Sequence, residues 1–93
     1  MKTYLIGYDL NKSGQNYDAL INRIKEISSI WWHNLDSTWI IKSNSSAKDI
    51  RDDLKLYIDA NDELLVAGLT GEAAWAGFKD KGSTWLLNNI LPS

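Results

Sequence analysis

Hydrophobic side chains alternate along the first ten residues of the chain. One face of residues 2–10 carries Tyr4, Ile6 and Tyr8, and the other carries Leu5, Gly7 and Asp9. A period of two predicts a β-strand, and apolar residues on both faces indicate a strand buried on both sides. This pattern predicts that Asp9, at the end of the strand, faces inward with Leu5 and Gly7.

Apolar residues then recur at spacings of three and four in two later segments, which predicts two amphipathic helices. The first helix is expected over residues 15–27, after a polar loop at 11–14. Ser46 is a suitable N-cap for the second, which is expected to run to about residue 59. Three further strands are expected at residues 30–33, 37–42 and 63–69, with turns at 34–36 and 60–62.

The predicted order is therefore strand, helix, strand, strand, helix, strand. This order favours an α+β ferredoxin-like βαββαβ sandwich with an antiparallel four-stranded sheet, in which both helices cover one face. All 93 residues are expected to form one domain, with a core of about 1–70 and a C-terminal extension of about 71–93. In the extension we expect a turn at 80–82, and a final helix over 84–91 capped by Ser83.

Aromatic residues are unusually frequent for a chain of this length, with five tryptophans, four tyrosines and one phenylalanine. So many rings exceed what a small core holds, and the surplus indicates a partner surface, most simply a second copy of the chain. The candidate binding or interface residues are Trp31, Trp32, His33, Trp39, Trp75 and Phe78. Alternation sends Trp31 and Trp32 to opposite faces. The rings fit a core plus a dimer interface, or a platform on which nucleic-acid bases stack.

Composition excludes several classes of protein. The net charge of −2 argues against a protein that coats nucleic acid, and the absence of cysteine excludes disulfides and thiolate chemistry. There is no apolar run of the roughly 20 residues that cross a membrane, and no signal-peptide pattern, so a cytoplasmic protein is expected. No glycine-rich phosphate loop, zinc-protease motif or serine-triad pattern is present.

Acidic residues mark the ends of three predicted strands. In the expected topology the end of the first strand meets the starts of the third and fourth, which brings Asp9 toward Asp36, and toward Asp62 and Glu63. Carboxylates gathered at a sheet edge can hold Mg²⁺ or Mn²⁺, and such an ion can activate water for phosphodiester cleavage. Asp36 and Asp62 have an alternative explanation, because turns favour aspartate without any ligand. His33 is either a packed interface residue or a base.

The opening YLIGYDL, with its strand-terminal Asp9, resembles the small CRISPR-associated ferredoxin-like endoribonucleases of the spacer-integration complex and the VapD-like ribonucleases. Nearly the whole chain, including WWHNLDSTWII, NDELLV and GEAAWAGF, is similar to small bacterial and phage proteins that carry the label SinR family. The first resemblance implies a homodimer in which one aspartate from each subunit flanks a metal ion, and only Asp9 matches that role. The loop at residues 11–14 lacks the arginines usual in that family.

Two functions stay open from the sequence. One is a nucleic-acid-related homodimer that acts as a metal-dependent endoribonuclease on RNA, or on DNA, with Asp9 as the metal ligand. The other is a non-catalytic homodimeric module that binds a protein or nucleotide ligand through its aromatic surface, in a phage or host-defence setting.

Overall fold

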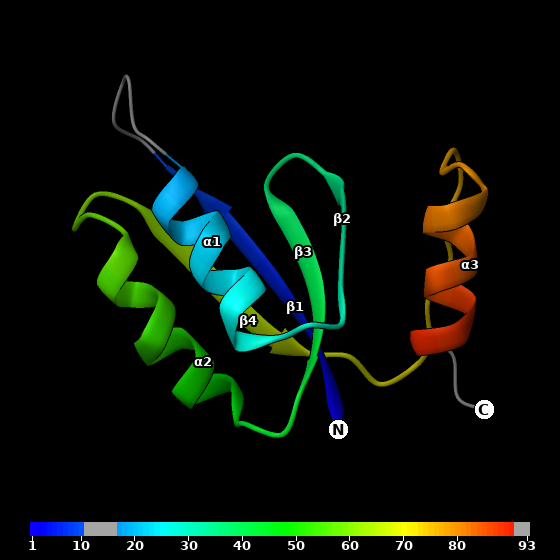
Figure 1. Ribbon diagram of the computed structural model, residues 1–93, viewed down its shortest axis with the longest axis horizontal. Helices are drawn as coiled ribbons and strands as arrows, with labels where there is room; N and C mark the ends of the chain where they lie inside the picture. Colours follow the sequence, from blue (N-terminus) through cyan, green and yellow to red (C-terminus); the bar gives the residue numbers. More distant parts are fainter. Residues whose placement is uncertain (11–16, 91–93) are drawn as a thin grey trace.

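The computed structural model describes residues 1–10 and 17–90, and these form a ferredoxin-like α+β fold (Figure 1). The predicted order βαββαβ is confirmed, and one further helix follows it. The elements are β1 (Lys2–Asp9), α1 (Asp18–Ile27), β2 (Trp31–Leu35), β3 (Thr38–Ser43), α2 (Ala47–Leu54), the short 3₁₀ helix η1 (Lys55–Tyr57), β4 (Glu63–Gly68) and α3 (Asp80–Asn89).

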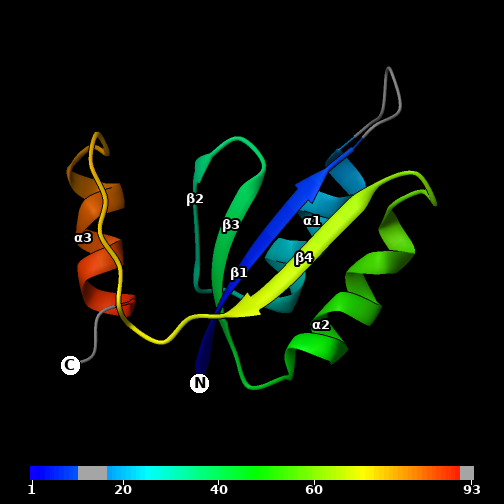
Figure 2. The ribbon, with the colours of Figure 1, turned by 180° about the vertical axis from the view of Figure 1, so that it is seen from behind.

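The four strands form one antiparallel sheet in the order β2-β3-β1-β4. β1 is central because it is paired on both sides, with Gly7 opposite Thr38 of β3 and opposite Leu65 of β4. Seen from behind, β1 and β4 lie in front of α1 and α2, so both helices cover the same face (Figure 2). Short connections and right-handed crossovers leave the opposite face without a helix from the βαββαβ unit.

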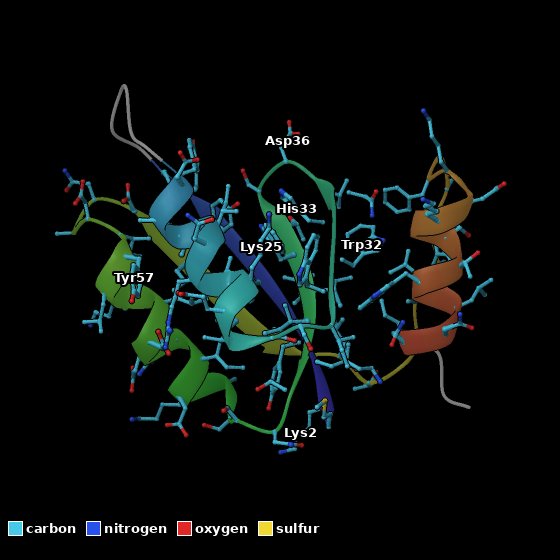
Figure 3. The ribbon with its side chains drawn as sticks, viewed as in Figure 1. Lys2, Lys25, Trp32, His33, Asp36 and Tyr57 are labelled. Carbon is cyan, nitrogen blue, oxygen red and sulfur yellow. The ribbon has the colours of Figure 1, made fainter. Side chains whose placement is uncertain are left out.

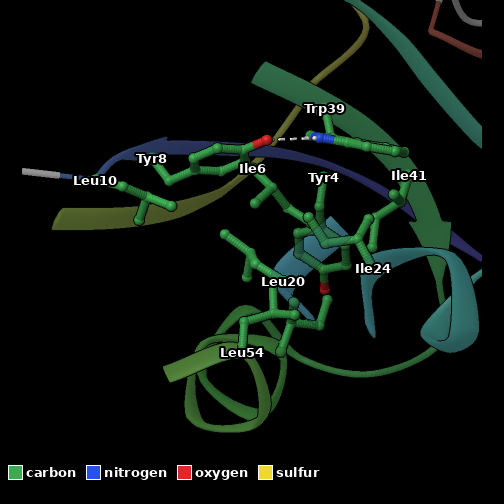
Figure 4. Packing of buried hydrophobic residues seen from close by; sticks show 10 residues of the cluster. Tyr4, Ile6, Tyr8, Leu10, Leu20, Ile24, Trp39, Ile41 and Leu54 are labelled. Carbon is green, nitrogen blue, oxygen red and sulfur yellow. Dashed lines mark hydrogen bonds between the residues drawn. The ribbon is translucent and has the colours of Figure 1, made fainter. Parts of the chain in front are cut away.

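The main core lies between the sheet and these two helices (Figure 4). The residues of β1 that point into it are Tyr4, Ile6 and Tyr8, as the alternation predicts. They pack on the apolar stripes of α1 and α2, whose buried members are Leu20 and Ile24, and Ile50 and Leu54. Tyr4 keeps its hydroxyl satisfied, because that group donates to the backbone oxygen of Ser45 at 2.7 Å.

An ion pair joins the two helices outside this core. Arg23 of α1 donates two hydrogen bonds of 2.7 Å to the two carboxylate oxygens of Asp53 in α2. Bidentate pairs of this kind combine charge attraction with fixed geometry. The two hydrogen bonds from Arg23, followed by its charge, hold the pKa of Asp53 below the usual range against the opposing effect of burial.

The C-terminal extension covers the part of the other face that β2 and β3 form. Trp32 and Ile40 of the sheet are buried there against Leu86 and Ile90, and partly buried Trp75 and Phe78 pack around them. The Trp32 side chain points from β2 toward α3 (Figure 3), and its Nε1–H donates to the backbone oxygen of Gly82 at 3.1 Å. A second apolar cluster therefore fixes the extension, whose position the sequence did not predict.

The beginning of α3 differs from the prediction. A turn at 80–82 with Ser83 as N-cap was expected, but the helix already begins at Asp80, and its N-cap Lys79 makes no side-chain capping hydrogen bond. Gly82 lies inside this helix, and a Cβ added there would be 3.1 Å from Nδ2 of Asn34. A close tertiary contact, rather than a turn, accounts for this glycine.

Other boundaries shift by a few residues. β2 continues to Leu35, so the turn is shorter than the predicted 34–36, and α2 ends at Leu54 before η1 instead of continuing to residue 59. The predicted loop 11–14, the first two residues of the helix 15–27 and the last residue of the helix 84–91 lie outside the described residues. Within the described chain, every helix is too short or too polar to cross a membrane.

Replacement of Leu86 tests whether α3 is held by the second cluster. Leu86 is 2% exposed, whereas the next residue, Leu87, is 52% exposed on the same helix. We expect Leu86→Ala to lower the free energy of unfolding by about 2–5 kcal/mol, through lost burial and a residual cavity. Leu87→Ala should change it by less than about 0.5 kcal/mol. Urea denaturation followed by circular dichroism measures both, and equal effects would mean that α3 is not docked in this way.

The Arg23–Asp53 pair predicts a specific pH dependence. Because the pKa of Asp53 is lowered by folding, its contribution to stability is present above the unfolded pKa of about 3.9 and is lost as pH falls through the folded pKa. Arg23→Gln should therefore reduce stability at pH 7 and flatten the acid limb of the stability curve. Lys2→Gln removes the same charge from an exposed strand end and should leave the limb unchanged. Denaturation curves between pH 7 and pH 2 distinguish the two; parallel acid limbs in the wild type and Arg23→Gln would contradict the expectation.

Candidate functional site

Two carboxylates lie opposite each other at one end of the sheet. Asp9, the last residue of β1, is the cross-strand partner of Glu63, the first residue of β4. Tyr8 and Leu64 point into the core on the helix side, so alternation places Asp9 and Glu63 on the opposite face. A surface depression there is lined by Gly7, Tyr8, Asp9, Glu63, Leu64 and Leu65.

The prediction that Asp9 faces inward was wrong, because its side chain is exposed. Alternation had correctly grouped Asp9 with Leu5 and Gly7, but that face of β1 is only half-buried. The C-terminal extension packs on β2 and β3, and the β1–β4 half of the face stays open: Leu65 is 60% exposed. Asp9 is therefore accessible to an ion or to another molecule.

Asp36 and Asp62 belong to turns, whereas Asp9 is the last residue of a strand. Asp36 lies at the tip of the β2–β3 hairpin (Figure 3) and is exposed. Asp62 closes the turn before β4: its Oδ2 accepts the backbone N–H of Asp59 at 2.7 Å, and its own N–H donates to the Asp59 carbonyl at 3.0 Å. Among the described residues, no group of three or more acids or histidines is arranged to hold a metal ion. A single chain therefore offers Asp9 and Glu63, rather than three aspartates.

Glu63 was not among the predicted metal ligands, although the expected topology placed it with Asp62 at the start of the fourth strand. Which of these two neighbours faces Asp9 depends on the register between β1 and β4, and the register is a property of the folded sheet.

Three of the candidate aromatic residues form a packed row on the helix side of the sheet. The His33 ring stacks on Trp39 with centroids 3.9 Å apart and planes 8° apart, and Trp31 tilts against Trp39 at 5.1 Å. Lys25 of α1 places its Nζ 5.2 Å from the Trp31 ring. His33 Nδ1 is 3.1 Å from the carbonyl of Thr38, so when Nδ1 donates there, Nε2 is left as the acceptor.

Trp39 is the centre of this row and is fully buried. Its Nε1–H donates to the Tyr8 hydroxyl at 3.1 Å (Figure 4). Burial raises the pKa of Tyr8 above its ordinary value, so the phenol stays neutral and can accept this hydrogen bond at any physiological pH. Trp39 thus contributes to the core, as one of its two interpretations predicted, and it has no exposed ring face for a stacked base.

The remaining candidate rings gather on the other face of the sheet. Trp32 meets Phe78 edge to face, with centroids 4.9 Å apart and planes at 83°. Trp75 donates its Nε1–H to the hydroxyl oxygen of Ser83 at 3.0 Å, which fixes the indole against α3. These three rings line a cavity of about 320 Å³ between the sheet and the extension. Their predicted role at an interface between chains stays a prediction.

No protein-family model matches the chain, and no solved structure matches it. The resemblances drawn from the sequence therefore stay expectations, and the function has to be inferred from the residues and their positions.

Removing the Tyr8 hydroxyl tests the hydrogen bond at the centre of the aromatic row. Tyr8→Phe leaves the buried Trp39 N–H without its acceptor, which should cost about 1–3 kcal/mol of unfolding free energy. Tyr17→Phe removes the same atom from a tyrosine that is 39% exposed, and should be nearly neutral. Urea denaturation gives both values. If Tyr8→Phe were as neutral as its control, the Trp39 N–H would have another partner in the folded protein.

Proposed function

We propose that this chain acts as a homodimeric, divalent-metal-dependent endoribonuclease, in which Asp9 and Glu63 hold the metal ion. The observation that supports this proposal is the register of β1 and β4, which places two carboxylates opposite each other on an exposed sheet face.

The donor set fits Mg²⁺ or Mn²⁺. Magnesium in phosphoryl-transfer sites is held by one or two carboxylates, with waters and substrate phosphates completing its coordination. Asp9 and Glu63 provide such a pair, and their exposure leaves room for an RNA phosphate. The ion would supply an activated water and would neutralise charge on the phosphate. The role of this chain's own residues is to hold and orient that ion at the end of β1.

A second copy of the chain would complete the site. The apolar surface beside the acids includes Leu65, which is 60% exposed, and half-buried Leu5 and Ala67. Burial of this surface against an identical one is favourable and produces a two-fold interface. Such a dimer would bring a second Asp9 toward the first, the arrangement that the sequence resemblance implies.

The acidic net charge shapes how RNA would bind. With a net charge of −2, the chain has no general basic excess with which to attract phosphates. Affinity for the backbone would then depend mainly on the metal ion itself. We therefore expect weak RNA binding in the absence of metal.

A second candidate function is supported by a different surface. Trp31 is 37% exposed, and a hollow of about 200 Å³ beside it is also lined by Trp85, Lys81 and Asn34. An aromatic face next to a cation and an amide suits a nucleotide. This hollow favours the non-catalytic homodimeric module as the alternative.

Cleavage of labelled RNA and DNA, with Mg²⁺, Mn²⁺ or EDTA, tests the first function. The variants are Asp9→Asn and Glu63→Gln, which keep size while removing charge. Both should lower the metal-dependent rate by roughly 100-fold or more, since even partners of metal ligands contribute 10–100-fold. Asp36→Asn changes an exposed acid at the hairpin tip and should keep wild-type activity.

Circular dichroism of each variant serves as the control that it is folded. Metal-dependent cleavage lost in both variants, together with a dimer by sedimentation, would support the proposal. Cleavage that survives in Asp9→Asn, or no cleavage with either metal, would overturn it and direct attention to nucleotide binding beside Trp31.

A further inference from the structure

An apolar pocket lies away from Asp9, between the sheet and the C-terminal extension. Its volume is about 320 Å³, and its floor is the sheet face at Trp32 and Ile40. Phe78 and Leu86 line it from the extension, and Ala73 and Ala74 border it on the irregular segment between β4 and α3. Ligand pockets begin at roughly this size.

The segment beside this pocket is rich in glycine and alanine, whose small side chains leave the pocket open. Residues 69–79 form no helix or strand, and Gly71 and Gly77 bend the chain with positive φ angles of 102° and 88°. Between the two glycines, Ala73 and Ala74 are exposed and line this pocket with small side chains. The Trp75 indole is held against Ser83, and the second cluster anchors Leu86, so neither is free to collapse inward.

The lining determines what could bind. No charged residue borders the cavity, and Thr38 is the polar side chain among those that do, apart from the two indoles. Both indole N–H groups are already paired, Trp32 with the Gly82 carbonyl and Trp75 with Ser83. A charged ligand would therefore lose its hydration without compensation. An apolar ligand would remove the apolar lining from water, which is favourable.

The size and lining of the cavity narrow the class of ligand further. A dry cavity of about 150 Å³ lined by aliphatic and aromatic residues holds one benzene ring. This cavity is about twice as large, and its walls include the faces or edges of Trp32, Trp75 and Phe78. We propose that it binds a neutral, planar, apolar molecule of about two fused rings. This site is separate from Asp9 and Glu63 and does not depend on the proposed ribonuclease activity.

Titration of the full chain with naphthalene, beside its anionic analogue 2-naphthalenesulfonate, tests the proposal. Naphthalene should raise the melting temperature in a concentration-dependent way, because it binds the folded state alone. The sulfonate should raise it far less at equal concentration. In two-dimensional NMR of the indole N–H groups, naphthalene should shift the signals of Trp32 and Trp75. The Trp39 signal should stay in place, because that indole lies in the other cluster.

Cavity-filling variants locate the binding. Ala74→Leu adds a side chain at a cavity-lining position and should weaken naphthalene binding by about tenfold or more, as overpacking typically costs over 1 kcal/mol. Ala73→Leu is the second such variant, in case the first is unstable. Ala19→Leu makes the same change on the exposed side of α1 and should leave naphthalene binding unchanged.

Three results would overturn the proposal. The first is no stabilisation of the wild type by naphthalene. The second is equal stabilisation in Ala74→Leu or Ala73→Leu, which would place the binding elsewhere. The third is a wild-type dimer that dissociates in these variants while naphthalene has no effect, because the cavity would then be a contact between two copies of the chain.

Discussion

A four-stranded sheet has two faces, and the two crossover helices of this fold can cover only one of them. Both candidate sites depend on how much of the second face is covered. The C-terminal extension buries the β2–β3 half of it around Trp32, and the β1–β4 half stays exposed around Leu65. The covered half contains the apolar cavity, and the exposed half contains the paired carboxylates. Two candidate sites thus lie on one incompletely covered face of the sheet.

The sequence predicted those parts of the fold that a local repeat of hydrophobic residues determines. Alternation along β1 and the apolar stripes of α1 and α2 determine which side chains face the main core, and these predictions were confirmed. The beginning of α3 could not be predicted in this way, because Asp80, Lys81 and Gly82 read locally as a turn. The close approach of Asn34 favours glycine at this helical position, and the hydrogen bond from Trp32 to the Gly82 carbonyl joins the helix to β2.

For the candidate site too, local patterns predicted one part and long-range contacts decided the rest. Alternation could say that Asp9 shares a face with Leu5 and Gly7, but it could not say whether anything covers that face. Likewise, the expected topology brought the ends of three strands together, but only the register could select Glu63 over Asp62 as the residue opposite Asp9. Asp62 instead stabilises the turn that leads into β4. Long-range pairing, rather than local propensity, decides which acids meet.

The order of the strands also gives the sheet two unequal edges. β2 forms one edge, and α3 lies beside it, joined through the Trp32–Gly82 hydrogen bond. β4 forms the other, and its six residues include neither lysine nor proline, the residues that most often discourage strand addition. Among the described residues, β4 is therefore the edge that lies farther from α3 and is more accessible to a strand of another molecule.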